Sequence, residues 1–181
     1  MAPELRALGF RGSRQTFRKR LDDVFCVVNF QGSRSGQHFF VNLAAQPTFV
    51  PAEGGADPKA AKEYECILRT RVGGFWLWAM GDADFEAFKA GLMPAQDAFF
   101  ETARSLSRAV LADPVDVLLR TFTGPVTTEA RIALHLARAA LVLRDPPKAE
   151  ALGRHGLELA GDARTLRAEL EAVVATAARV S

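Results

Sequence analysis

Side chains that could do chemistry are concentrated in one stretch, VFCVVNFQGSRSGQHFFVNLAAQ, which spans residues 24–46. It contains the amides of Asn29, Gln31 and Asn42 and the imidazole of His38. Amides donate and accept hydrogen bonds, and an imidazole changes its charge near neutral pH. This set suits recognition of another molecule, provided that the chain presents it on one surface.

The apolar and polar residues of this stretch alternate, which predicts two strands, residues 24–31 and 37–45, joined by the loop GSRSG. A register that sets Phe30 beside Phe39 and Val28 beside Val41 makes one face of the hairpin wholly apolar. A slip by one residue would bury amides without partners, at about 1–3 kcal/mol each. We therefore expect the apolar register and its faces.

A further strand is predicted at residues 65–72, with Cys66, Leu68, Thr70 and Val72 on the apolar side. The opposite face then carries amide, imidazole, guanidinium and aromatic groups: Asn29, Gln31, His38, Phe40, Asn42, Arg69 and Arg71. A solvated polar face is common in antiparallel sheets. Arginine and aromatic residues among amides are also typical of binding hot spots, so this set is the candidate binding site.

No catalytic or metal motif accompanies these residues. His135 and His155 have no carboxylate or cysteine at a spacing that completes a metal site. In GSRSG, Arg34 stands where a nucleophile elbow needs serine. Phosphate-binding and dinucleotide-binding glycine patterns are missing from the sequence. We predict a protein that is not an enzyme and has no cofactor or metal; His38 acting with an unidentified acid is the enzymatic alternative.

Composition is that of a globular protein: 181 residues, 49% hydrophobic and 24% charged, with a net charge of +2. No segment has the roughly 20 apolar residues that span a bilayer, so no membrane partner is expected. Cys26 and Cys66 are interpreted as buried thiols in a reducing compartment, and the cytoplasm is the predicted location.

Basic residues cluster in RGSRQTFRKR, residues 11–20. A charged edge strand would explain them, because like charges oppose edge-to-edge pairing. The alternative is that this cluster and the basic sheet face bind nucleic acid. The cluster comprises Arg11, Arg14, Arg18, Lys19 and Arg20.

The remaining pattern predicts an α+β fold with a four-stranded antiparallel meander. Its first strand lies at residues 13–20, and the proline-, glycine- and alanine-rich residues 47–65 form an exposed loop. Helices follow from Gly81, with Pro94 starting a new one and Asp113 capping another before Pro114. We expect a sheet domain over residues 1–112 and a helical extension, residues 113–181, which packs on it as one compact unit.

Several short motifs in the predicted strands and just before them resemble those of the bacterial domain-of-unknown-function family 4304. They are Gly9-Phe10, Phe17, Asn29-Phe30-Gln31, Phe39, Val41-Asn42-Leu43 and the pair Arg69 and Arg71, and the similarity covers about residues 5–110. The resemblance implies that the amides belong to the family pattern, and it brings no catalytic residues.

Small αβ domains of this kind also resemble the immunity proteins of bacterial toxin systems, which neutralise a toxin by covering its active site. We therefore predict an interaction protein with a protein partner, of the immunity type, that binds a toxin through the polar face. Nucleic-acid binding is the alternative function.

Overall fold

The structure is a computed structural model that describes residues 1–180, which divide into two compact units. The sheet unit contains Met1–Thr48 and Ala52–Arg104, and the helical unit contains Phe49–Pro51 and the chain from Ser105 onward. The antiparallel sheet and the helices confirm the predicted α+β class. Within residues 1–180, every helix is too short or too polar to cross a lipid bilayer.

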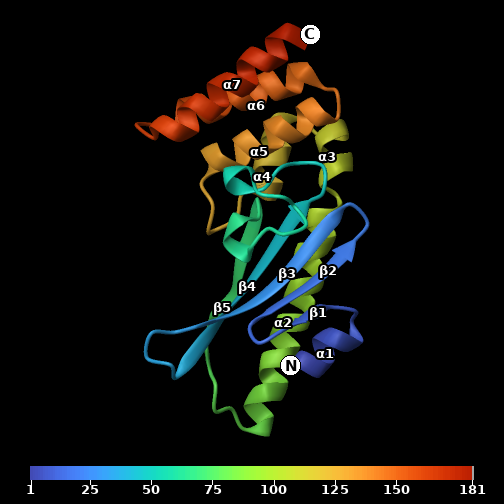
Figure 1. The fold of residues 1–181 in the computed structure, drawn as a ribbon, viewed down its shortest axis with the longest axis vertical. Coiled ribbons are helices and arrows are strands. Elements are labelled where there is room, and N and C mark those ends of the chain that lie inside the picture. Colours follow the sequence, from blue (N-terminus) through green and yellow to red (C-terminus); the bar gives the residue numbers. More distant parts are fainter. Residues whose placement is uncertain (181) are drawn as a thin grey trace. The chain divides into compact units, whose positions relative to one another are not determined.

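The sheet is an antiparallel meander of five strands in chain order, one more than predicted (Figure 1). The additional strand lies at residues 11–13, just before most of the predicted first strand, and the chain turns back between the two at Arg14, whose φ is 57°. Gly12 is needed there, since a Cβ on it would lie 2.2 Å from the Thr16 carbonyl oxygen. The strands are β1 (Arg11–Ser13), β2 (Thr16–Leu21), β3 (Val24–Gly32), β4 (His38–Pro47) and β5 (Leu68–Leu77).

The register of the central hairpin differs from the predicted one by two residues. Phe30 pairs with Val41, not with Phe39 as predicted. Val28 pairs with Leu43, not with Val41 as predicted. A shift by two leaves every side chain on its predicted face, because the side-chain period of a strand is two. The loop sets the true register through a hydrogen bond of 2.8 Å from the Ser33 amide to the His38 carbonyl.

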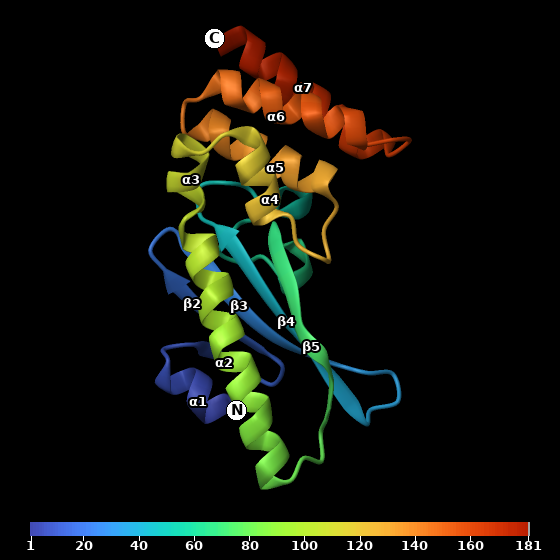
Figure 2. The ribbon, with the colours of Figure 1, turned by 180° about the vertical axis from the view of Figure 1, so that it is seen from behind.

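The long helix α2 (Asp82–Arg104) packs against the apolar face of the sheet, as Figure 2 shows from behind. Its Phe88 ring lies 5.6 Å from the ring of Phe39 and 4.8 Å from that of Trp76. The prediction that Pro94 starts a new helix was wrong, because α2 runs through this proline. Buried residues on both sides of Pro94 hold the helix on the sheet, which offsets the missing backbone hydrogen bond.

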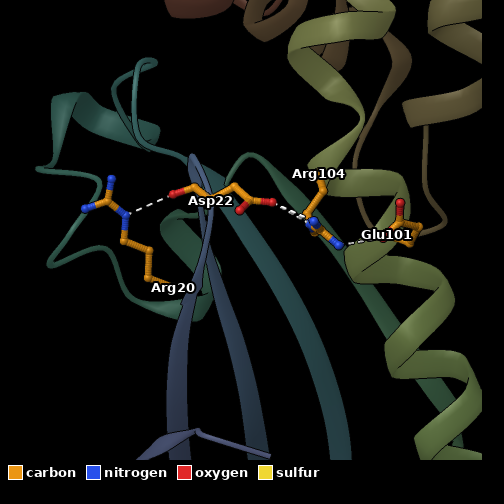
Figure 3. A network of polar contacts seen from close by, with 4 residues as sticks. All are labelled: Arg20, Asp22, Glu101 and Arg104. Carbon is orange, nitrogen blue, oxygen red and sulfur yellow. Dashed lines mark hydrogen bonds and ion pairs between the residues drawn. The ribbon is translucent and has the colours of Figure 1, made fainter.

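The end of α2 is tied to the β2–β3 turn by a polar network (Figure 3). Arg104 donates from Nε and Nη2 to Asp22 Oδ2, at 2.9 and 2.6 Å, and from Nη1 to Glu101 at 2.9 Å. Arg20 donates to the Asp22 carbonyl oxygen at 3.0 Å. The hydrogen bond to Asp22 raises the pKa of Arg104, and this network orients the turn relative to the helix.

The segment between β4 and β5 is not the exposed loop that its composition predicts. It contains the short 3₁₀ helices η1 (Glu53–Gly55) and η2 (Glu63–Glu65). Ala52, Ala61 and Cys66 are buried in a cluster with Val27 of β3 and Ala44 of β4. Small side chains allow this close packing, so the loop covers one end of the sheet face opposite α2. Cys66 accordingly lies before β5 and on this second face, not on the predicted one.

In the helical unit, the helix α5 (Glu129–Val142) contacts each of the other four helices, and its buried residues are mostly alanine and leucine. A Cβ on Gly156 would lie 2.6 Å from Leu170 Cδ2, so this glycine lets α6 approach α7 closely. Asp113 ends α3 and Pro114 precedes α4, which corrects the predicted Asp113 cap by one residue. The packing of this unit on the sheet stays a prediction. The helices are α3 (Leu106–Ala112), α4 (Val115–Phe122), α5 (Glu129–Val142), α6 (Pro146–Leu159) and α7 (Arg164–Val180), and α1 (Ala2–Ala7) belongs to the sheet unit.

Both cysteine thiols are free and buried, and burial raises the pKa of Cys26 and of Cys66 to about 12. At pH 8 only on the order of one thiol in 10,000 is then ionised, and the thiolate is the reactive form. We expect Ellman's reagent to label neither cysteine of the native protein within minutes and to label both in guanidinium chloride. Rapid labelling of one native thiol would contradict this burial.

Candidate functional site

The predicted site residues lie on the sheet face opposite α2, which we call the polar face. The strand pairing sets Asn29 beside Asn42, Gln31 beside Phe40, and Asn42 beside Arg71. Three neighbouring strands, β3, β4 and β5, therefore bring these side chains together, as the alternation predicts. What the pattern does not reveal is how the groups bond to one another.

Four of these residues form a connected group, the Arg71 cluster, which consists of Gln31, Phe40, Asn42 and Arg71. Arg71 donates from Nε to Asn42 Oδ1 at 3.0 Å and from Nη2 to Gln31 Oε1 at 3.1 Å. Asn42 also donates to Gln31 Oε1 at 3.0 Å, which closes the ring of hydrogen bonds. Asn42 is only 5% exposed, so it positions the other two polar groups and is not itself a contact residue.

The aromatic ring of Phe40 supports the guanidinium of Arg71 from one side. The Arg71 Cζ atom lies 4.4 Å from the ring centroid, within the range of a cation–π interaction. The His38 ring is a further neighbour of Phe40, at 6.0 Å. Arg71 is thus fixed in direction while its side chain remains exposed.

Two apolar residues that the sequence prediction missed extend this surface. Phe75 is 63% exposed and Leu77 is 52% exposed, and the Phe75 ring lies 5.0 Å from the ring of His38. The prediction ended the strand at Val72, whereas β5 continues past an irregularity in its pairing with β4. The run FWLW after the glycine pair was the available signal, because aromatic residues are enriched in strands.

Asn29 and Arg69 share the face but not the cluster. The Asn29 amide donates to Thr16 Oγ1 at 2.9 Å, so it joins β3 to β2. Arg69 lies near Glu63, whose pKa is raised by burial and lowered to a lesser extent by the charges of Arg69 and Arg71. Asn29 therefore serves the fold, whereas the Arg71 cluster presents an exposed guanidinium on the polar face.

The other end of the polar face is closed by the segment between β4 and β5. Gln46, which is fully buried, donates to the Pro47 carbonyl at 3.1 Å and accepts from the Ile67 amide at 3.1 Å. Arg18 donates to the Ala61 carbonyl at 3.2 Å. The end that carries the Arg71 cluster, Phe75 and Leu77 is exposed, and we call this end the open patch.

The basic residues 11–20 do not form one surface. Lys19 points to the face opposite Arg18 and donates to the Leu8 carbonyl at 2.7 Å. Arg20 is bonded to the carbonyl of Asp22. Several of these cations therefore have backbone partners and stabilise turns or loops.

The remaining histidines lie in the helical unit. His135 is buried in α5, and His155 Nε2 lies 2.7 Å from Glu129 Oε1. Within residues 1–180, no three or more His, Cys, Asp and Glu side chains gather in a group that could hold a metal ion. The arrangement on the polar face is suited to binding through charge, stacking and hydrogen bonds.

The fold and the polar face define an α+β domain with a five-stranded antiparallel meander, one long covering helix and an amide–arginine cluster. The family model described as "Domain of unknown function (DUF4304)" matches residues 1–129, and the chain belongs to this family. The resemblance seen in the sequence is thereby confirmed. Neither the curated proteins nor the solved structures that were searched give a match. All residues of the open patch lie within the matched part.

Proposed function

We propose that this chain is a non-enzymatic interaction protein that binds a protein partner through the open patch. The observation that supports it most is the Arg71 cluster, in which two amides and an aromatic ring hold one exposed guanidinium in place. Next to it, Phe75 and Leu77 expose apolar surface that contributes little to the core. Arginine and aromatic residues are the groups that dominate binding energy in protein interfaces.

The chemistry of the patch favours a partner with a carboxylate beside an apolar group. The two bonds to the amides use Nε and Nη2 of Arg71, which leaves Nη1 for the partner. Arginine binds carboxylates strongly through charge-assisted hydrogen bonds. Because the side chain is already ordered, little conformational entropy is lost when it binds.

The finer proposal is an immunity-type function in the bacterial cytoplasm, with a toxin as the partner. It is supported by the small αβ architecture and by a patch that could cover an acidic active site. Fold alone does not determine function, so the argument depends on the patch. The product of the neighbouring coding sequence is the first partner to examine.

The test compares Arg71→Glu and Phe75→Ala with Arg108→Glu, which changes the charge of an exposed residue on α3 in the same way. After capture and identification of the partner, we expect both patch variants to bind it at least about tenfold more weakly, since hot-spot truncations cost about 2 kcal/mol or more. Arg108→Glu should bind like the unaltered chain. Titration calorimetry measures the affinities, and thermal melting verifies that each variant is folded.

Equal affinity of all four proteins would remove the open patch from the proposal. For the immunity-type function, co-expression with the neighbouring gene product should protect growing cells, and Arg71→Glu should abolish that protection. Toxicity that the unaltered chain does not relieve would contradict the finer proposal while leaving the interaction surface to be judged by the binding data.

The second candidate is nucleic-acid binding, because Arg11, Arg18 and Arg20 lie on the polar face with Arg69 and Arg71. Phosphate contacts predict an affinity that falls steeply as salt rises, since bound cations are released from the nucleic acid. Titration of a labelled oligonucleotide at two ionic strengths distinguishes the candidates. Nucleic-acid binding would be favoured if the affinity falls steeply with salt and if Arg20→Ala and Arg71→Ala each lower the affinity.

A further inference from the structure

The sheet unit contains a second feature of interest on the face that α2 covers, a cavity of about 350 Å³. We call it the aromatic cavity, because most of its wall consists of rings. Cavities of a few hundred Å³ with largely apolar walls are typical of small-molecule sites in proteins. The rings that line it are Phe17, Phe30, Phe39, Trp78, Phe85 and Phe88.

The inner wall of the aromatic cavity is formed by residues whose positions the sheet fixes. Phe17, Phe30 and Phe39 come from three adjacent strands and are buried. The rings of Phe17 and Phe30 meet edge to face at 6.1 Å, and those of Phe30 and Phe39 at 5.8 Å. The wall is therefore already ordered without a ligand, which lowers the entropy cost of binding.

The outer wall is more open. Trp78, which follows β5, is 47% exposed even though its ring lies 4.3 Å from that of Phe39. Two charged residues, Arg14 and Asp82, also border the cavity and are exposed, so the cavity reaches solvent at this side. Water gains few hydrogen bonds inside an apolar cavity, whereas a polar group of a ligand would find partners at the opening.

We propose that the aromatic cavity binds a small planar aromatic molecule, about the size of two fused rings, with its polar substituent at the opening near Arg14 and Asp82. Aromatic walls that present both edges and faces favour an aromatic ligand through stacked and edge-to-face contacts. This site is on the opposite face from the open patch and does not depend on the proposed protein partner.

The probe for the test is 1-naphthol, titrated into the full chain by calorimetry. Phe85→Glu places a charged group in the wall, and Met80→Trp adds volume at a second lining residue. Leu111→Glu is the matched control, because Leu111 is exposed on α3 in the other unit. Near-ultraviolet circular dichroism verifies that the tertiary structure of each variant is retained.

We expect saturable binding of one 1-naphthol per chain, weakened at least about tenfold by Phe85→Glu and by Met80→Trp, because a charge in an apolar wall and lost volume both oppose it. Leu111→Glu should leave the affinity unchanged. Absence of saturable binding up to about 1 mM, a dissociation constant that corresponds to about −4 kcal/mol, would overturn the proposal. Equal affinity of every variant for the probe would overturn it as well.

Discussion

Replacing Phe88 by alanine is expected to lower the free energy of unfolding of the sheet unit by about 3–5 kcal/mol. Phe88 is buried at the centre of the contact between α2 and the sheet, where its ring meets those of Phe39 and Trp76. Strand pairing fixes the backbone positions of Phe39 and Trp76, so the sheet cannot close up on the space that the Phe88 ring would leave. The loss is a large part of the 5–15 kcal/mol that typically stabilises a domain.

Urea unfolding followed by tryptophan fluorescence measures this effect. The two tryptophans of the chain, Trp76 and Trp78, are both in the sheet unit, so the signal reports on that unit. Phe75→Ala is the control, because Phe75 lies in the same part of β5 and is exposed. It should change the free energy of unfolding by no more than about 0.5 kcal/mol. A loss below about 1 kcal/mol for Phe88→Ala would mean that α2 does not depend on this contact.

The faces of the sheet could be predicted from the sequence, but the register could not. Alternation in β3 and β4 separates Val28, Phe30 and Val41 from Asn29 and Asn42 whichever even shift applies. The geometry of the loop that ends at His38 selects among these shifts, and its five residues lack a distinctive turn sequence. A local pattern therefore predicted the composition of each face and not its exact neighbours.

Errors elsewhere arise where tertiary contacts override local preference. Pro94 disfavours a continuous helix, yet the sheet beneath α2 provides enough buried contact to keep one. Alanine, proline and glycine between β4 and β5 favour an exposed loop, yet Ala52 and Ala61 are small enough to pack flat on Val27 and Ala44. Neither contact is encoded within a window of neighbouring residues.

The candidate site shows the same division. The sequence predicted that Gln31, Phe40, Asn42 and Arg71 share a face, because strand alternation alone requires it. It did not predict that Asn42 is buried beneath the guanidinium, since this follows from hydrogen bonds between residues 29 positions apart. The difference changes the role of Asn42 from a contact to a positioning residue, and it places the exposed charge of the patch on Arg71.

A second large effect is expected from Gln46→Leu, which should lower the free energy of unfolding by about 1–3 kcal/mol. Gln46 is fully buried and its amide satisfies both the Ile67 N–H and the Pro47 carbonyl. Leucine has nearly the same volume but cannot bond, so the buried Ile67 amide would lose its partner. The segment between β4 and β5 would then detach from the sheet more often than the rest of the unit unfolds.

Limited trypsin digestion distinguishes this local opening from global unfolding, because Lys59 and Lys62 lie in the detached segment and are exposed. At a temperature where all the proteins are still folded, cleavage at these lysines should be faster in Gln46→Leu than in the unaltered chain. It should also be faster than in Phe88→Ala, whose change does not touch this segment. Gln37→Leu makes the same chemical change at an exposed position and should leave both cleavage and stability unaltered. If cleavage at these lysines were equally slow in Gln46→Leu, the alanine contacts and the hydrogen bond from Arg18 to Ala61 would suffice to hold the segment, and the buried amide would contribute nothing to closing that end of the polar face.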